Sequence, residues 1–199
     1  MSETSTSQDH VSYYIDHTIY TGRPADTTSR LPKEIRTYDL LDSLGIAYAR
    51  ADHDTLPTME ACQEVGNLLG IEICKNLFLR NTQKTAFYLL ILPGSKKFKT
   101  AALSKQIGSA RLSFAEPEFM EQYLNITPGS VSVLGLMNDP ENKVRLLIDK
   151  DILKNHPYFG CHPCINTSSL KLRTSDVFTT YLNAVHHDYI VVHLENRNE

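Results

Sequence analysis

The chain has 199 residues, of which 41% are hydrophobic and 22% are charged. This composition is typical of a soluble globular protein and excludes disordered, collagen-like and disulfide-scaffold chains. The net charge of -3 disfavours nucleic-acid binding through overall positive charge. The longest apolar stretch, residues 86–92, is far shorter than the roughly 20 residues that span a bilayer, and the polar N-terminus lacks the apolar segment of a signal peptide. We therefore expect one catalytic domain, cytoplasmic and without a membrane partner.

Two short groups of basic residues stand out against this acidic balance. The first has four lysines within residues 96–105, and the second is Lys171 with Arg173. Such groups form either a basic rim that attracts phosphates or an ordinary solvated face. The sequence leaves both interpretations open.

The first part of the chain differs from the rest. Residues 1–32 are rich in Ser, Thr, Asp and His and show no sustained helical or strand period. We predict an N-terminal extension there, poorly structured or docked on the domain, and a single domain over residues 33–195.

Hydrophobic periodicity predicts the elements of this domain. Helical spacing of apolar residues predicts helices over 35–44, 59–69, 100–107, 116–124 and 175–185. Apolar, β-branched and aromatic runs predict strands over 46–50, 74–80, 86–92, 111–114, 131–136, 143–148, 170–172 and 189–193. Thr58 is a typical N-cap for the second helix, and Gly70 a typical C-terminal stop. Because helices interrupt the strands irregularly, we predict an α+β fold with a mixed, mostly antiparallel central sheet flanked by helices.

Lys75 is an unusual residue within the strand over 74–80. Side chains alternate along a strand, so Lys75 shares a face with Leu77 and Leu79. An inward lysine needs an anionic partner, a ligand or loss of its charge, unless it reaches water at the strand end. The neighbouring Asn76 is expected to point to the other face.

A turn sequence, Thr127-Pro128-Gly129-Ser130-Val131-Ser132, precedes the predicted strand at 131–136. Successive backbone amides in such a turn are able to bind a carbonyl oxygen or a developing oxyanion. The same residues are also ordinary turn chemistry, and both interpretations stay open.

Cys161-His162-Pro163-Cys164 has the C-x-x-C spacing of redox and zinc sites. Since no second Cys/His pair lies at zinc-knuckle spacing, and four cysteines are too few for a disulfide framework, we expect free thiols and no metal. His162 remains a candidate acid/base or hydrogen-bonding group. A thiol or zinc protein built on Cys161 and Cys164 stays as an alternative.

No P-loop, dinucleotide fingerprint, G-x-S-x-G elbow or H-E-x-x-H motif is present. Any catalytic apparatus is therefore sparse. A sparse site suffices for a substrate that is already activated, such as an aminoacyl ester, because positioning and carbonyl polarisation then provide most of the catalysis.

The order of the motifs resembles the YbaK/prolyl-tRNA-synthetase-associated editing family, above all its freestanding alanyl-tRNA(Pro) deacylases. The resemblance covers residues 35–194. It is carried by Thr58-Met59-Glu60-Ala61-Cys62, Cys74-Lys75-Asn76-Leu77-Phe78-Leu79-Arg80, Tyr88-Leu89-Leu90-Ile91-Leu92-Pro93-Gly94, Thr127-Pro128-Gly129-Ser130-Val131-Ser132, Gly135-Leu136-Met137-Asn138-Asp139 and His162-Pro163-Cys164-Ile165-Asn166-Thr167.

The resemblance implies a role for each matching position. Lys75 takes the place of the family's activity-linked lysine and is expected to hold the 3′-terminal adenosine or its phosphate at the acceptor end of tRNA. Gly129 and Ser130 match the G-x-x-x-P loop that offers backbone amides to the carbonyl. His162 completes the catalytic set. The implied substrate-binding residues are Asn76, Val131, Ser132, Val133 and Asn166.

The implied reaction is hydrolysis in trans of a mischarged tRNA, first of all Ala-tRNA(Pro), with cysteine and serine as other candidate amino acids. It needs no cofactor, and prolyl-tRNA synthetase is a further expected partner. One departure stands at Val133, where the family usually has proline, so loop rigidity and substrate choice do not follow from the resemblance. The alternative is a noncatalytic module of the same fold that binds aminoacyl-tRNA or a synthetase.

Overall fold

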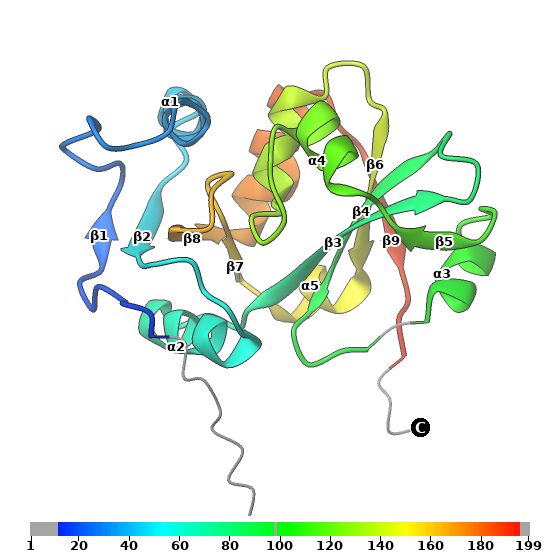
Figure 1. Ribbon diagram of the computed structural model, residues 1–199, viewed down its shortest axis with the longest axis horizontal. Coiled ribbons are helices and arrows are strands. Elements are labelled where there is room, and N and C mark those ends of the chain that lie inside the picture. The colour runs from blue at the N-terminus through cyan, green and yellow to red at the C-terminus, as the bar shows by residue number, and fades with distance from the viewer. Residues whose placement is uncertain (1–11, 98, 196–199) are drawn as a thin grey trace, which may run out of the picture.

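The computed structural model describes residues 12–97 and 99–195, and within them forms two β-sheets with helices around them (Figure 1). The four-stranded sheet has the order β1-β2-β8-β7, with strands Tyr20–Thr21, Tyr48–Asp52, Ser168–Arg173 and Tyr158–Cys161. The five-stranded sheet has the order β5-β3-β4-β6-β9, with strands Leu112–Phe114, Cys74–Asn81, Phe87–Pro93, Val144–Asp149 and Tyr189–Val192. The α+β class with mostly antiparallel pairing is confirmed, although the strands are shared between two sheets and not collected in one.

The helices fall largely where hydrophobic periodicity predicts them. They are α1 (Pro32–Ser43), α2 (Met59–Leu69), α3 (Thr100–Gln106), α4 (Pro117–Leu124), α5 (Lys150–Asn155) and α6 (Leu182–Ala184), together with a π-helical segment at Asp176–Tyr181. Thr58 caps α2 by accepting a hydrogen bond from the Ala61 amide, and Gly70 ends it in the left-handed conformation. Within the described residues, no helix has the length and apolar character that crossing a bilayer requires.

The strand predicted over 131–136 is wrong. Residues Val133–Asn138 form a 3-10 helix, which Ser132 caps through a hydrogen bond from the Leu134 amide to its hydroxyl. Gly135 lies so close to α4 that an added Cβ would be 3.1 Å from Cβ of Leu124. The apolar run is therefore buried by packing against a helix. A short apolar run has the same pattern in a buried strand and in a buried helical segment, so the sequence did not distinguish the two.

The main core lies where the two sheets face each other. Phe78, Leu89 and Ile91 enter it from the five-stranded sheet, and Phe159 and Leu170 from the four-stranded sheet. A second core on the far side of the five-stranded sheet includes Leu103 of α3, and a third packs α2 against β2. The β3–β4 hairpin, β7 and the start of β8 consequently meet at one junction between the sheets.

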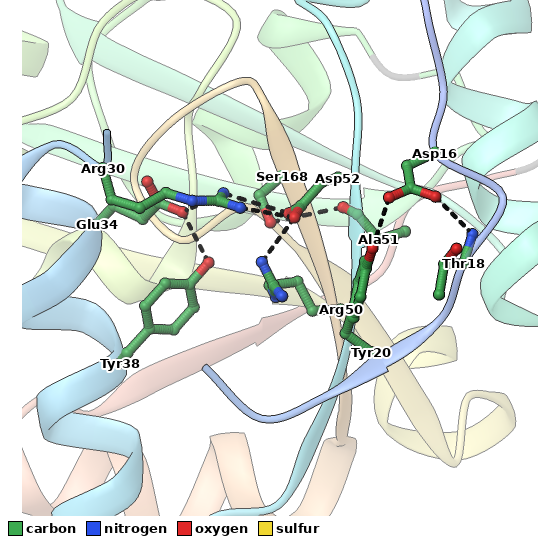
Figure 2. A network of polar contacts seen from close by, with 10 residues as sticks. All are labelled: Asp16, Thr18, Tyr20, Arg30, Glu34, Tyr38, Arg50, Ala51, Asp52 and Ser168. Atoms are coloured by element: carbon green, nitrogen blue, oxygen red, sulfur yellow. Dashed lines mark hydrogen bonds and ion pairs between the residues drawn. The ribbon is translucent and has the colours of Figure 1, made fainter. Parts of the chain in front are cut away.

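The N-terminal extension docks on the domain as far as it is described. Ile15 is buried against the α2 cluster and forms an isolated bridge with His53, while β1 pairs with β2. Figure 2 shows Arg30 and Arg50 both directed at Asp52, with Nη to Oδ2 distances of 2.7 Å. Residues 1–11 lie outside the described part, and the domain boundary at residue 32 stays a prediction.

Candidate active site

The junction of the two sheets encloses a small cavity of about 40 Å³. Its wall is mostly apolar, with a few polar groups, and consists of Leu56, Cys62, Ile71, Ile73, Cys74, Asn76, Gly160, Cys161, His162 and Ser169. Three strands and α2 therefore contribute to it. On the usual criterion of about 10–15 Å³ for one water, the cavity has room for a few small groups and no more.

His162 presents one free ring nitrogen at this cavity. Its Nδ1 lies 2.8 Å from the Ser168 carbonyl oxygen, and since a carbonyl only accepts, Nδ1 carries the proton. Burial lowers the pKa of His162 to about 4, so the ring is neutral at pH 7. Nε2 has no hydrogen-bond partner among the described residues and is left as a lone-pair acceptor.

Asn76 supplies the second unpartnered acceptor. Its Nδ2 donates to the Cys74 carbonyl at 3.4 Å, while Oδ1 is buried without a hydrogen-bond partner among the described residues. A buried amide oxygen without a donor costs about 1–3 kcal/mol and is uncommon in native structures. The predicted site residues Asn76 and His162 thus line the same cavity, and leaving the Asn76 oxygen unpartnered carries an energetic cost.

Lys75 reaches a different place, because it lies on the other face of β3. It is partly buried, and its Nζ donates to the Lys96 carbonyl at 2.7 Å. Lys96 is itself fixed, since its Nζ forms ion pairs at 2.8 Å with Asp149 and 2.7 Å with Asp151. Lys96 is only 3% exposed, so it does not belong to a basic rim.

The predicted oxyanion loop is a type II turn over residues 127–130. Gly129 has φ +87°, as the third position of such a turn requires, and the Ser130 amide donates to the Thr127 carbonyl at 3.0 Å. The Ser130 amide and hydroxyl are thus both engaged within the turn. Of the two predicted donors, the Gly129 and Ser130 amides, the Gly129 amide makes no hydrogen bond to the described residues and is therefore free to donate.

The remaining predicted binding residues are packed inside the protein around the turn. Ser132 is fully buried and contacts Cys161, which lines the cavity, while Val133 is fully buried in the main core. Val131 is partly buried against the same core. Asn166 packs onto the turn, where a Cβ on Gly129 would be 2.7 Å from its Nδ2. None of these four side chains lines the cavity, and their binding roles stay predictions.

The C-x-x-C segment shows no features of a metal or redox site. Cys161 and Cys164 are buried free thiols, and burial raises the pKa of both, to about 11 for Cys164. Thiolates, the form that binds metals and attacks disulfides, are thus disfavoured at neutral pH. Among the described residues, no group of three or more His, Cys, Asp or Glu side chains is placed to hold a metal ion.

Several cavity residues escaped the sequence analysis. Ile71 and Gly160 carry no chemical signal of their own, and Ser169 was hidden in a predicted loop. His53, beside the cavity, also escaped: its Nε2 lies 2.9 Å from the Ser169 hydroxyl and its ring packs edge-on to that of His162, with centroids 6.1 Å apart. In the sequence, the one signal for His53 is its position as a histidine shortly after a predicted strand.

Comparison with known proteins places the chain among editing domains. The model of the aminoacyl-tRNA editing domain family matches residues 53–180. The chain is 32% identical over 137 residues to the prolyl-tRNA editing protein ProX of Acetoanaerobium sticklandii, which covers 69% of this chain and 83% of that protein. It is 29% identical over 170 residues to prolyl-tRNA synthetase associated domain-containing protein 1 of Xenopus laevis, which covers 83% and 98%.

Solved structures show the same fold. A crystal structure of a protein proposed as a trans-editing enzyme for prolyl tRNA synthetase superposes with a TM-score of 0.61 at 19% identity, over 84% of this chain and 99% of that one. The family-model match over residues 53–180, which includes Asn76 and His162, and the 32% identity to ProX establish the family. The chain belongs to the aminoacyl-tRNA editing domain family.

Proposed function

We propose that this protein is a deacylase that hydrolyses mischarged tRNA in trans, with Ala-tRNA(Pro) as its first substrate. The observation that carries the proposal is that Asn76 and His162, each with an acceptor atom unpartnered among the described residues, both line one small and mostly apolar cavity. An aminoacyl ester brings an α-ammonium group that donates hydrogen bonds to such acceptors, and the solvent water that attacks the ester is a second donor. The name of the relative ProX, a prolyl-tRNA editing protein, supports the same reaction class.

The size of the cavity supports alanine over proline. We propose that a methyl side chain fits a space of about 40 Å³ better than a pyrrolidine ring, which would crowd the side chains of the walls. Forcing extra methylene groups into a packed site costs about 1–3 kcal/mol or more. Rejection of the larger, correct amino acid is therefore steric, which is the direction in which a pocket discriminates well.

The proposed chemistry uses three groups: the His162 ring, the Gly129 amide and the Lys75 ammonium. Water adds to the ester carbonyl carbon, and neutral His162 accepts its proton at Nε2. The carbonyl oxygen becomes an oxyanion, and the proposed backbone donor to it is the Gly129 amide. When the carbon–oxygen bond to the ribose breaks, the proton passes to the departing ribose oxygen. Lys75 is proposed to hold the tRNA end near the ester by its positive charge.

A second candidate is a noncatalytic module that binds aminoacyl-tRNA or a synthetase. Val133 favours this candidate, because it replaces the proline usual in the family and so removes a residue that would make the loop rigid. Because Val133 is buried in the core and not in the cavity, its effect on the pocket is indirect. The two candidates differ in turnover and not in binding.

Single-turnover hydrolysis separates them. The protein, in excess, is mixed with Ala-, Ser-, Cys- and Pro-tRNA(Pro), and the remaining ester is followed with time. The proposal predicts rapid loss of the alanyl ester and retention of the prolyl ester. The substitution His162→Ala should slow the reaction by about 10²–10⁴-fold, while His17→Ala, at an exposed residue of the extension, should not. Lys75→Ala should abolish deacylation with the fold intact. Specific binding without hydrolysis of any ester would instead support the noncatalytic module.

A further inference from the structure

A second, larger depression adjoins the small cavity. It is an open cleft of about 430 Å³, a volume in the range of small-ligand sites. Ile71 lines both the cavity and the cleft and so forms a shared wall between them. The remaining lining of the cleft combines apolar backbone and ring surfaces with polar groups and consists of Gly70, Glu72, Pro93, Ser95, Lys96, Asp151, Asn155, His156, Pro157 and Tyr158.

We infer that this cleft binds the terminal nucleoside of the tRNA, with the adenine base stacked on Tyr158. The inference rests on the proposed function, because it places the nucleoside next to the amino-acid cavity. The ester joins the amino acid directly to the terminal ribose, so a nucleoside site must adjoin the amino-acid site. Neighbouring residues of β3 serve the two sides: Asn76 lines the cavity, and Lys75 hydrogen-bonds the carbonyl of Lys96, a residue of the cleft.

The surface of the cleft suits a base. Tyr158 is 41% exposed, and Pro93 and Pro157 offer flat apolar surface beside it. Lys171 lies over the Tyr158 ring, with Nζ 4.6 Å from the centroid, and donates to the Leu69 carbonyl, so it fixes the ring from one side. Aromatic side chains held in this way are the usual platforms for unpaired bases.

The charges of the cleft favour an uncharged nucleoside over a phosphate. Lys96 and Asp151 already neutralise each other, with Asp149 as a third partner. The Glu72 carboxylate remains; its Oε1 accepts a hydrogen bond from Ser95, and its Oε2 lies 3.7 Å from Nε2 of His156. A carboxylate repels phosphate but accepts hydrogen bonds from ribose hydroxyls and from the amino group of adenine. Lys75 and Lys171 each donate to one backbone carbonyl and keep further N–H groups, which we assign to the phosphodiester that precedes the nucleoside.

Titration with free adenosine tests this site without any catalytic readout. Chemical shifts of the ¹⁵N-labelled protein are followed as adenosine, guanosine or ribose is added. Adenosine should shift Gly70, Ile71 and Tyr158 first. Guanosine should bind more weakly, because it presents a carbonyl oxygen where adenine presents an amino group. Tyr158→Ser should weaken adenosine binding about tenfold, the loss expected for one stacked base, whereas Tyr158→Phe should bind like the wild type.

The control is Tyr14→Ser, which removes an exposed aromatic side chain in the extension. In deacylation, Tyr158→Ser should raise KM for Ala-tRNA(Pro) about tenfold with kcat nearly unchanged. Adenosine shifts located elsewhere, or unchanged affinity in Tyr158→Ser, would overturn the inference even if deacylation is found. Conversely, adenosine binding in the cleft without hydrolysis of any ester would retain the nucleoside site and refute the deacylase.

Discussion

The substitution Gly160→Ala should close the amino-acid cavity without disturbing the backbone. Gly160 lies in β7, lines the cavity and does not have positive φ, so alanine is compatible with its conformation. An added Cβ would lie 2.5 Å from Cδ1 of Ile71, whereas ordinary contacts begin at 3.4 Å. The end of the Ile71 side chain must therefore move by about 1 Å, at an overpacking cost of about 1–3 kcal/mol.

This shift should affect function more than folding. The new methyl group and the displaced Ile71 both narrow a space of only about 40 Å³. A misplacement of about 1 Å in a catalytic site reduces the rate by about 10²-fold. We therefore expect kcat/KM for Ala-tRNA(Pro) to fall about 100-fold in deacylation assays, while thermal unfolding remains cooperative and at a slightly lower temperature.

A second substitution makes this prediction specific. Ile71→Val removes Cδ1, the atom that the new methyl group would meet at 2.5 Å. By itself it should cost about 0.5–1.5 kcal/mol of stability. In the double variant Gly160→Ala/Ile71→Val the activity should recover to within about tenfold of the wild type. Wild-type activity in Gly160→Ala, or an equally inactive double variant, would refute the assignment of this cavity as the amino-acid pocket.

Three further predictions concern pH and stability. Burial lowers the pKa of His162 from 6.5 to about 4, so between these pH values the unfolded chain binds more protons than the folded protein. The free energy of unfolding should therefore fall by up to about 3 kcal/mol as the pH drops from 6.5 to 4. Urea unfolding at several pH values should show this fall in the wild type and a smaller one in His162→Gln. Asp52→Asn should destabilise the protein by about 1.5–3 kcal/mol, because it weakens the ion pairs to Arg30 and Arg50. The control Asp39→Asn, at an exposed ion pair, should cost under about 1 kcal/mol. Equal losses of stability in the two variants would contradict the role of the network in Figure 2. Thr58→Ala should cost about 0.5–2 kcal/mol through the lost cap, and no change in the denaturation midpoint would argue against it.

Local signals predicted most of the elements. The cap at Thr58, the stop at Gly70 and the period between them placed α2 correctly, because each is a short-range effect of the backbone. The β3–β4 hairpin was equally clear, since its two apolar runs flank a polar turn. By contrast, α5 and β7 are short, and the division into two sheets depends on long-range pairings such as β2 with β8, which no local pattern encodes.

The candidate site was predictable in its residue types and less so in its geometry. Asn76 and His162 were identified and do share a cavity, although they lie more than eighty residues apart. Ser130 and Ser132 were placed at the substrate by resemblance, yet their hydroxyls bond the turn and the 3-10 helix. Polar side chains in a turn serve the backbone as readily as a ligand, and only the folded arrangement distinguishes the two uses.

Single-turnover kinetics of the variant Asn76→Ala beside the wild type test the central claim most directly. The claim is that the unpartnered Asn76 oxygen and His162 form the pocket in which the ester is hydrolysed. With saturating protein, the account predicts that the wild type removes alanine but not proline from tRNA(Pro), and that Asn76→Ala loses most of this rate while retaining a cooperative thermal transition. Hydrolysis of Ala-tRNA(Pro) by Asn76→Ala at the wild-type rate would contradict the claim.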